Sequence, residues 1–180
     1  CPKRIEIIGC VSGLRGYRKK RAARRTVLFD KRNDGQPTTV TLKHQSARVA
    51  RLEYDLINSP DLAQTLVVCC AMMNIPFHFK GLASLKIKET DRIKALKTEL
   101  RKLGYVVQDL NDSELLWNGE RCEPTGEAIE TYEDHRMALA FAPAAIVYPH
   151  LQIDNPCVVT KSYPCFWDDL RQAGFEVTEQ

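Results

Sequence analysis

The amino-acid sequence predicts an α/β fold built from repeated helix-strand-helix-strand units, with buried parallel helices and mixed sheets arranged about a pseudo-threefold axis. The first observation is a gapless internal repeat with an offset of 73 residues. An aspartate, a proline and a lysine carry it at equal spacing: Asp61, Pro76 and Lys88 recur as Asp134, Pro149 and Lys161. The second observation is that LRKLGYVV (100–107) answers LRQAGFEV (170–177). A period this long indicates a few large units that close on one another rather than an open solenoid.

The elements of the complete repeat follow in order from residue 61. The segment 61–73 is hydrophobic nearly all round, which predicts a buried helix, and a strand-like run follows Pro76. The helix after Lys88 carries one apolar stripe, so it is expected on the surface, and it ends at Gly104 as a left-handed C-cap. Further strands are predicted at 38–42 and 114–117. The stripe consists of Ile93, Leu96, Leu100 and Leu103.

These elements predict one domain of three repeats, the first incomplete at about 1–45, the second at about 51–120 and the third at about 125–180. In the first repeat, residues 5–11 align with the strand after Pro76, residues 16–25 with the amphipathic helix and residues 26–30 with the strand that follows it. The apolar helix that should precede Pro2 is missing. We therefore expect the chain to start inside a repeat and to leave apolar surface uncovered near residues 5–11, which favours self-association.

Composition narrows the class of protein. The 180 residues suffice for one domain, the net charge is +3, and no apolar run is long enough to span a membrane. Residues 1–25 carry nine Lys or Arg against one acid, which suits nucleic acid or a loop facing an anionic substrate; without interleaved aromatic residues, we expect no nucleic-acid partner. Seven cysteines without a C-x-x-C pair favour reduced, mostly buried thiols in a cytosol and no metal site.

The repeat also gathers the candidate site residues. Asp61 follows Ser59-Pro60, a good N-cap and N1 pair, and Asp134 is expected in the first turn of its helix, before His135 and Arg136. Helix N-termini attract anions. Taken alone, Asp61 is an ordinary cap and His135 an ordinary structural residue.

A second set of candidates comes from the helices after each strand. Lys88, Glu89 and Arg92 are expected at a helix start, with Lys88 and Arg92 on one face, and Lys161 begins the corresponding helix. Their structural interpretation is a salt-bridged helix start. If the units pack in parallel about an axis, all these helix ends meet at one rim. Arginines there would grip carboxylate or phosphate, and the carboxylates would act as acid and base, so the sequence predicts a small, multiply anionic substrate.

Four motifs resemble the C-terminal half of the EPSP synthases, members of the enolpyruvyl transferase family. They are SPDLAQT (59–65), IKETDR (87–92), YEDHRMALAF (132–141) and TKSYPCF (160–166), in family order, and the resemblance covers about residues 51–178. It implies transfer of the enolpyruvyl group of phosphoenolpyruvate to the 5-hydroxyl of shikimate 3-phosphate, by addition and elimination, with no metal or organic cofactor.

The resemblance also implies roles for individual residues. Asp61, Ser84 and Lys88 would contact shikimate 3-phosphate, and Glu89 would transfer a proton at the methylene carbon while Asp61 takes the hydroxyl proton. The residues expected at phosphoenolpyruvate are Arg92, His135, Arg136 and Lys161. Ser84 departs from the family pattern, because many members have asparagine at that position.

The family's N-terminal domain has no counterpart in the sequence, so we expect half of an active site and no activity from the chain alone. A bacterial cytoplasm is favoured over a plastid. Two alternatives remain: the UDP-sugar enolpyruvyl transferase branch of the superfamily, and a non-catalytic anion- or nucleic-acid-binding fragment that relies on the basic residues 1–25.

Overall fold

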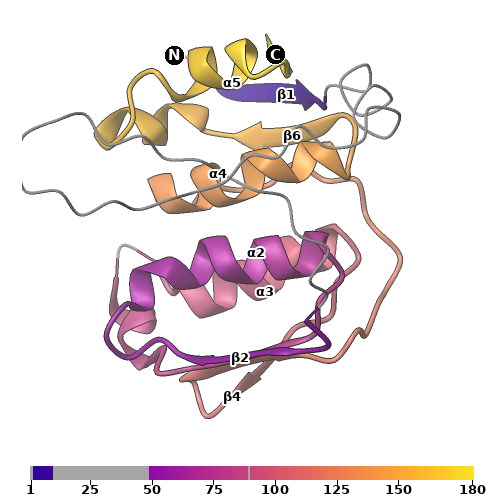
Figure 1. Cartoon of the computed structure of the whole chain (residues 1–180). Helices are drawn as coiled ribbons and strands as arrows, with labels where there is room; N and C mark the ends of the chain where they lie inside the picture. The colour runs from indigo at the N-terminus through magenta and orange to yellow at the C-terminus, as the bar shows by residue number, and fades with distance from the viewer. Residues whose placement is uncertain (1, 10–48, 89) are drawn as a thin grey trace, which may run out of the picture. The chain divides into compact units, whose positions relative to one another are not determined.

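Two small sheets and the helices packed on them make up the structure, a computed structural model that describes residues 2–9, 49–88 and 90–180 (Figure 1). The described residues belong to one compact unit. The prediction of an α/β fold with mixed sheets is confirmed, whereas the pseudo-threefold axis and the three repeat boundaries stay predictions. The segments predicted at 16–25, 26–30 and 38–42 lie outside the described residues.

The first sheet has four strands in the order β2-β3-β5-β4. β2 and β3 run parallel, while the β3–β5 and β5–β4 pairs are antiparallel, so the sheet is mixed. Alternating burial in β3 and β5 places Phe77, Phe79 and Trp117 in the core. The strands are β2 (Leu52–Asp55), β3 (Phe77–Lys80), β4 (Gln108–Leu110) and β5 (Glu114–Trp117).

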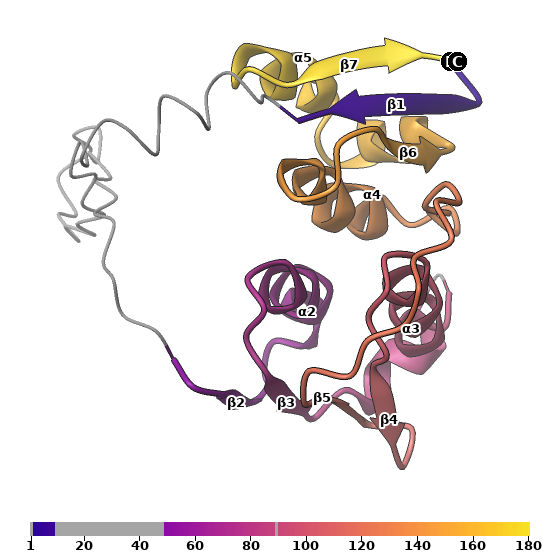
Figure 2. The same cartoon turned by 90° about the vertical axis from the view of Figure 1, so that its right-hand side faces the viewer.

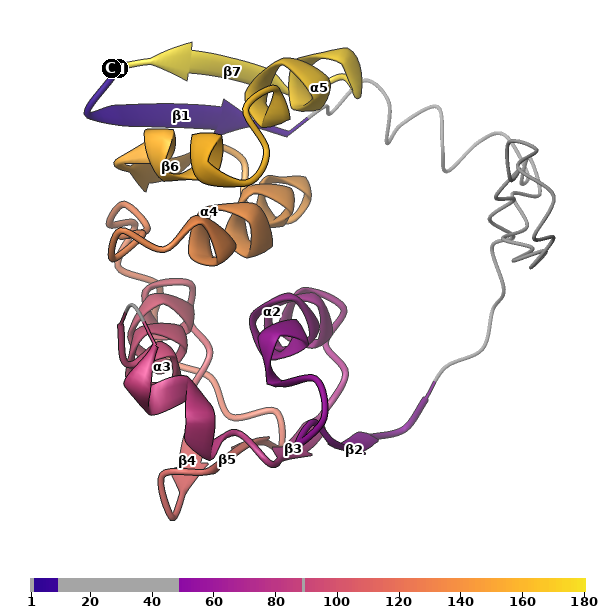
Figure 3. The same cartoon turned by 90° about the vertical axis from the view of Figure 1, so that its left-hand side faces the viewer.

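Helices α2 and α3 lie side by side over one face of this sheet (Figures 2 and 3). The predicted apolar stripe of α3 is confirmed, because all four of its residues are buried. The chain then turns at Gly104, whose φ of 88° is the predicted left-handed conformation. The helices of this part are η1 (Pro60–Leu62), α2 (Ala63–Met72), η2 (Ala83–Ile87) and α3 (Arg92–Lys102).

The second sheet has three strands in the order β6-β1-β7, and β1 is antiparallel to both neighbours. Helix α4 leads through η3 to β6, and α5 leads to β7. The elements are β1 (Arg4–Ile8), α4 (His135–Phe141), η3 (Ala142–Ile146), β6 (Leu151–Asp154), η4 (Pro156–Lys161), α5 (Phe166–Gln172) and β7 (Glu176–Glu179).

Strand β1 takes a different place from the one predicted for residues 5–11. In the first sheet, β5 lies between β3 and β4 and is antiparallel to both; β1 holds that position between β6 and β7. The alignment with the strand after Pro76 is therefore wrong, because β1 pairs with β6 and β7 in the way that β5 pairs with β3 and β4. Ile5 and Ile7 are buried there, so the expected uncovered surface does not lie on this strand.

Among the described residues, exposed apolar side chains lie instead along α2 and the segment from α4 to η3. Met73 and Ile146 are 63% and 49% exposed, and they border a groove of about 370 Å³. Most residues of α2 are buried, but one side of it lines this groove, so the predicted buried helix is buried only in part. The groove is lined by Thr65, Val68, Cys69, Met72, Met73, Leu139, Ala140, Pro143, Ala144, Ile146 and Val147.

The cysteines also depart from expectation. Among the described residues, Cys70 is buried, but Cys69 and Cys165 are exposed free thiols. Cys157 is disulfide-bonded. The prediction of reduced thiols is therefore wrong at Cys157, and the prediction of buried thiols is wrong at Cys69 and Cys165.

Candidate functional site

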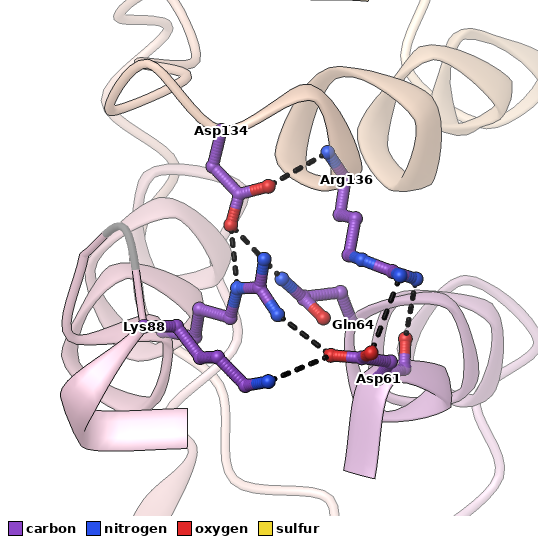
Figure 4. Close-up of polar contacts among 6 residues, drawn as sticks. Asp61, Gln64, Lys88, Asp134 and Arg136 are labelled. Carbon is purple, nitrogen blue, oxygen red and sulfur yellow. Dashed lines mark hydrogen bonds and ion pairs between the residues drawn. The ribbon is translucent and has the colours of Figure 1, made fainter. Parts of the chain in front are cut away.

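The candidate site is centred on the carboxylate of Asp61, in the short helix η1 that leads into α2. Its side chain is 41% exposed and lies among three cationic side chains, those of Lys88, Arg92 and Arg136. Figure 4 shows Lys88 and Arg136 reaching toward it from different sides. The predicted gathering of these four residues is therefore present in the structure.

Arg92 forms the buried base of the cluster. Its side chain is 2% exposed at the first residue of α3, and it bridges two carboxylates. The Nε–H donates to Asp134 Oδ2 over 2.6 Å, and Nη1 donates to Asp61 Oδ1 over 2.9 Å. Because guanidinium and carboxylates satisfy one another here, a charge that would be costly to bury alone becomes a fixed part of the site.

Asp134 is the fully buried partner of that arginine and also the N-cap of α4. Its Oδ1 accepts the backbone N–H of Arg136 over 2.9 Å, while Oδ2 faces Arg92. The side-chain amide of Gln64 donates to the same Oδ2 over 3.3 Å. Asp134 therefore ties the start of α4 to α2 and to α3.

Arg136 and Lys88 are the solvent-facing cations of the cluster, with side chains 37% and 38% exposed. Arg136 donates to the Asp61 backbone carbonyl and to its Oδ2, over 3.2 Å and 3.3 Å. Lys88 Nζ lies 3.9 Å from Asp61 Oδ1. These long contacts are weaker than the Arg92 pairs and leave both cations able to exchange Asp61 for an incoming anion.

The arrangement suits a small anion beside a carboxylate. Among the described residues, the cluster brings together three cations and two carboxylates. Asp61 remains partly open to solvent and can accept a proton from a bound hydroxyl group once an anion has taken over its cationic partners. Fixed charges of this kind stabilise a negative charge that develops during a reaction.

The other predicted site residues are placed differently. His135 is the half-buried first residue of α4. Ser84 is exposed in η2, and Lys161 is the exposed last residue of η4. Among the described residues, no hydrogen bond or ion pair links these three side chains to the Asp61 cluster. Glu89 and the basic residues 15–25 lie outside the described part of the chain.

Three details of the helix starts differ from the prediction. Helix α3 begins at Arg92 with Asp91 as its N-cap, so Lys88 precedes the helix and does not share a helical face with Arg92. Lys161 ends a short helix instead of beginning one. Asp134 is itself the cap of α4, while Ser59 makes no side-chain capping bond. Tertiary packing, not a common helix face, brings Lys88 and Arg92 to Asp61.

Sequence reasoning missed Gln64 and the contact role of Asp134. The repeat gave a signal for Asp134, because it occupies the position equivalent to Asp61. Nothing in the sequence distinguishes Gln64 from other polar residues of an apolar helix. Its Oε1 atom is buried without a hydrogen-bond partner among the described residues, next to the buried ion pair.

A metal centre and a membrane span are the other classes of site to consider. Within residues 2–9, 49–88 and 90–180, no group of three or more His, Cys, Asp and Glu side chains is placed to hold a metal ion. Over the same residues, no helix has the length and apolar character needed to cross a membrane.

Comparison with known proteins connects this geometry to a family. The profile of EPSP synthase (3-phosphoshikimate 1-carboxyvinyltransferase) matches residues 32–170. A 3-phosphoshikimate 1-carboxyvinyltransferase from Bacteroides fragilis is 63% identical over 141 residues, which cover 78% of this chain and 34% of the relative. One from Clostridium acetobutylicum is 40% identical over 126 residues, covering 69% and 29%. The chain thus spans about a third of the length of these curated relatives.

Solved structures agree at the level of the fold. An EPSP synthase from Acinetobacter baumannii superposes with a TM-score of 0.56 at 24% sequence identity, over 67% of this chain and 29% of the other. At that identity the likeness supports the fold and leaves the residue roles to the site geometry.

Proposed function

Because this chain belongs to the EPSP synthase (3-phosphoshikimate 1-carboxyvinyltransferase) family, we propose that it supplies half of the active site of such an enzyme. The reaction transfers the enolpyruvyl group of phosphoenolpyruvate to the 5-hydroxyl of shikimate 3-phosphate and releases phosphate. The observation that carries the proposal is the meeting of three cations on one partly exposed carboxylate, Asp61. The matching relatives favour this branch over the UDP-sugar branch.

The two solvent-facing cations take the anionic substrates in this proposal. Arg136 binds the carboxylate or phosphate of phosphoenolpyruvate, since a guanidinium matches either group with two parallel hydrogen bonds. Lys88 meets the phosphate of shikimate 3-phosphate as a point charge. Arg92 is buried and held between two carboxylates, so it fixes Asp61 and Asp134 and adds positive charge beneath the substrates.

Proton transfers follow from the carboxylates. In the addition step, the 5-hydroxyl oxygen attacks the enol carbon, Asp61 takes the hydroxyl proton, and Glu89 gives a proton to the methylene carbon. In the elimination step, the methyl group returns a proton to Glu89, the bond from carbon to phosphate oxygen breaks, and inorganic phosphate leaves. The role of Glu89 rests on the KETDR motif alone. His135, Ser84 and Lys161 remain candidates that domain closure would have to bring to the substrates.

The proposal includes a second polypeptide segment. A single domain offers one side of a clamp and cannot exclude water from the reacting groups. We therefore propose that this chain turns over substrate only with the N-terminal domain found in its full-length relatives. The bacterial relatives favour a cytoplasmic setting for the enzyme.

Calorimetric titration tests the proposal. The chain is titrated with shikimate 3-phosphate, with phosphoenolpyruvate and with both, and the titrations are repeated on Arg136→Ala and on the control Arg51→Ala, which removes another arginine paired on the surface. We expect Arg136→Ala to weaken phosphoenolpyruvate binding about tenfold or more, since a charged hydrogen-bonded pair is lost. Arg51→Ala should bind as the unchanged chain does. Unchanged phosphoenolpyruvate binding by Arg136→Ala would contradict the assignment of this cluster as the substrate site.

Turnover is the second measurement. Supplying a relative's N-terminal domain in trans should restore phosphate release from the two substrates, and Arg136→Ala should abolish it. The alternative function, a non-catalytic anion- or nucleic-acid-binding fragment, predicts a different result. The basic residues would then retain the chain on heparin, with retention that falls steeply with salt, and shikimate 3-phosphate would not protect the chain.

A further inference from the structure

The loop that leads into α4 has a strained backbone immediately before the site. Tyr132 and Glu133 are consecutive residues with φ of 54° and 56°, in the left-handed backbone region that residues other than glycine rarely adopt. The next residue, Asp134, pairs with Arg92 and caps the helix that begins with His135 and Arg136. Strain of this kind persists only where the surroundings hold it in place.

The carboxylate of Glu99, on α3, holds that loop. Glu99 is fully buried, although it belongs to a helix with charged residues on its outer side. Its Oε1 accepts the hydroxyl of Tyr132 over 2.7 Å, and its Oε2 accepts the backbone N–H of Glu130 over 3.0 Å. Lys102 Nζ lies 2.7 Å from the same Oε2. A buried carboxylate with this set of partners is satisfied, and it fixes the beginning of the strained turn.

Arg92 and Glu99 act from one face of α3. They are seven residues apart, which is close to two helical turns, and both are buried. Arg92 takes Asp134 at the end of the loop, while Glu99 takes Glu130 and Tyr132 at its beginning. One rigid helix therefore sets the position of the whole segment that presents Arg136.

We propose that Glu99 and Tyr132 form a positioning pair for the anion site, holding the left-handed turn that places Asp134 and Arg136 beside Asp61. The identity of the anion rests on the proposed function, but the positioning role does not. Neither residue touches the cluster itself; both act through the loop.

The hydroxyl group of Tyr132 is suited to a permanent role of this kind. Burial, and then its hydrogen bond to the Glu99 carboxylate, raise the pKa of Tyr132 above the usual range. The hydroxyl thus stays protonated and donates at neutral pH. The hydrogen bond from Tyr132 to Glu99 therefore does not depend on pH near neutrality.

Amide hydrogen exchange of Tyr132→Phe tests the pair without any ligand. The matched control is Tyr148→Phe, which removes another hydroxyl with a 2.7 Å hydrogen bond, to the carbonyl of Leu103. In Tyr132→Phe we expect the Asp134 and Arg136 amides to exchange about tenfold faster, because their hydrogen bonds depend on the turn, while amides of α2 stay unchanged. Tyr148→Phe should leave the Asp134 and Arg136 amides as they are.

Glu99→Gln provides a second variant of the same tie. It keeps the size of the side chain but turns Oε1 or Oε2 into an NH₂ group that faces a donor, so it should also speed exchange at Asp134 and Arg136. Unchanged exchange at both amides in Tyr132→Phe and in Glu99→Gln overturns the inference. So does an equal rise in Tyr148→Phe, which would indicate general loosening.

Phosphoenolpyruvate titrations separate this inference from the proposed function. Tyr132→Phe should weaken binding about fivefold to tenfold, and should have no further effect in an Arg136→Ala background, since the tie acts through Arg136. A full Tyr132→Phe effect in that background contradicts the positioning role. Absence of binding by the unchanged chain would count against the half-site proposal, while the exchange rates alone would still decide the positioning role.

Discussion

Individual side chains decide the chemistry of this chain, and the two that form the Arg92–Asp134 pair are almost fully buried. Its side chains are 2% and 0% exposed, and the Nε to Oδ2 distance is 2.6 Å. Asp61, only a few ångströms from the same guanidinium, is 41% exposed. Two aspartates thus share one arginine but differ in burial, and the difference separates a structural carboxylate from one able to meet a substrate.

Replacing each aspartate by asparagine should reveal that difference. Asp134→Asn removes the buried charge that pairs with Arg92 Nε over 2.6 Å, so we expect the free energy of unfolding to fall by about 3–5 kcal/mol. Asp61→Asn removes a partly exposed charge and should cost about 1 kcal/mol or less. Urea unfolding of both variants measures the two values. Similar small losses for both would show that the buried pair contributes little to folding.

The sequence predicted which residues meet at Asp61 but not the buried residues that hold them in place. Asp61, Lys88, Arg92 and Arg136 stand in motifs, and the repeat places them at equivalent helix ends. The buried supports, Gln64 and Glu99, look like ordinary polar residues of helices, because burial of a polar side chain depends on which segments pack above it. Lys88 shows the limit of helical spacing as a guide, since it reaches Asp61 from outside α3.

At the scale of elements, α3, which carries Arg92 of the candidate site, and the turn after it hold neighbouring segments in place. Gly104 ends the helical run with φ of 88°, and its carbonyl accepts the backbone N–H of Cys122 over 3.0 Å. A Cβ atom at this position would lie 2.8 Å from the carbonyl oxygen of Cys122. The glycine is therefore required both by conformation and by the close approach of a second segment.

Alanine substitutions at two glycines separate these causes. Gly126 has a similar φ of 71°, but no atom lies within 4 Å of a Cβ added there. Gly126→Ala should destabilise the fold by about 1 kcal/mol through backbone strain alone. Gly104→Ala should cost about 2–4 kcal/mol, since the steric contact adds to that strain. Thermal and urea unfolding compare the two, and equal losses would rule out the contact as a cause.

Elements with a clear pattern were predicted well, and pairing partners were not. The apolar stripe of α3 and the glycine that follows it identify that helix from sequence. Strand β1 also reads as a strand, but a strand pattern does not say which strands it joins. Its alignment with the run after Pro76 failed because pairing depends on the fold as a whole.

At the scale of the molecule, the apolar groove along α2, α4 and η3 is the surface from which we expect self-association in solution. Its lining is almost wholly apolar, and Met73 and Ile146 stand exposed at its border. Exposed apolar surface of this extent favours contact with another apolar surface. The predicted tendency to self-associate thus keeps its physical basis, although its location moves from residues 5–11 to these helices.

Charged substitutions in the groove test that tendency. Met73→Lys and Ile146→Lys should weaken self-association about tenfold or more, because a lysine ammonium cannot be buried against an apolar partner. Ile57→Lys is the control, since Ile57 is 63% exposed but does not line the groove. Sedimentation velocity over a range of concentrations gives the comparison. A monomeric unchanged chain at high concentration would contradict the prediction.

The place of β1 has a consequence for the order of folding. Residues 4–8 are made long before the residues with which they pair, 151–154 and 176–179. Since β1 is the middle strand, neither β6 nor β7 has its partner strand until β1 reaches them. Contacts so far apart in sequence close slowly, and β1 waits with both hydrogen-bonding edges unpaired. The second sheet therefore forms only after its last strand has been made, and a chain cut before residue 176 would leave β1 without β7, one of its two partners.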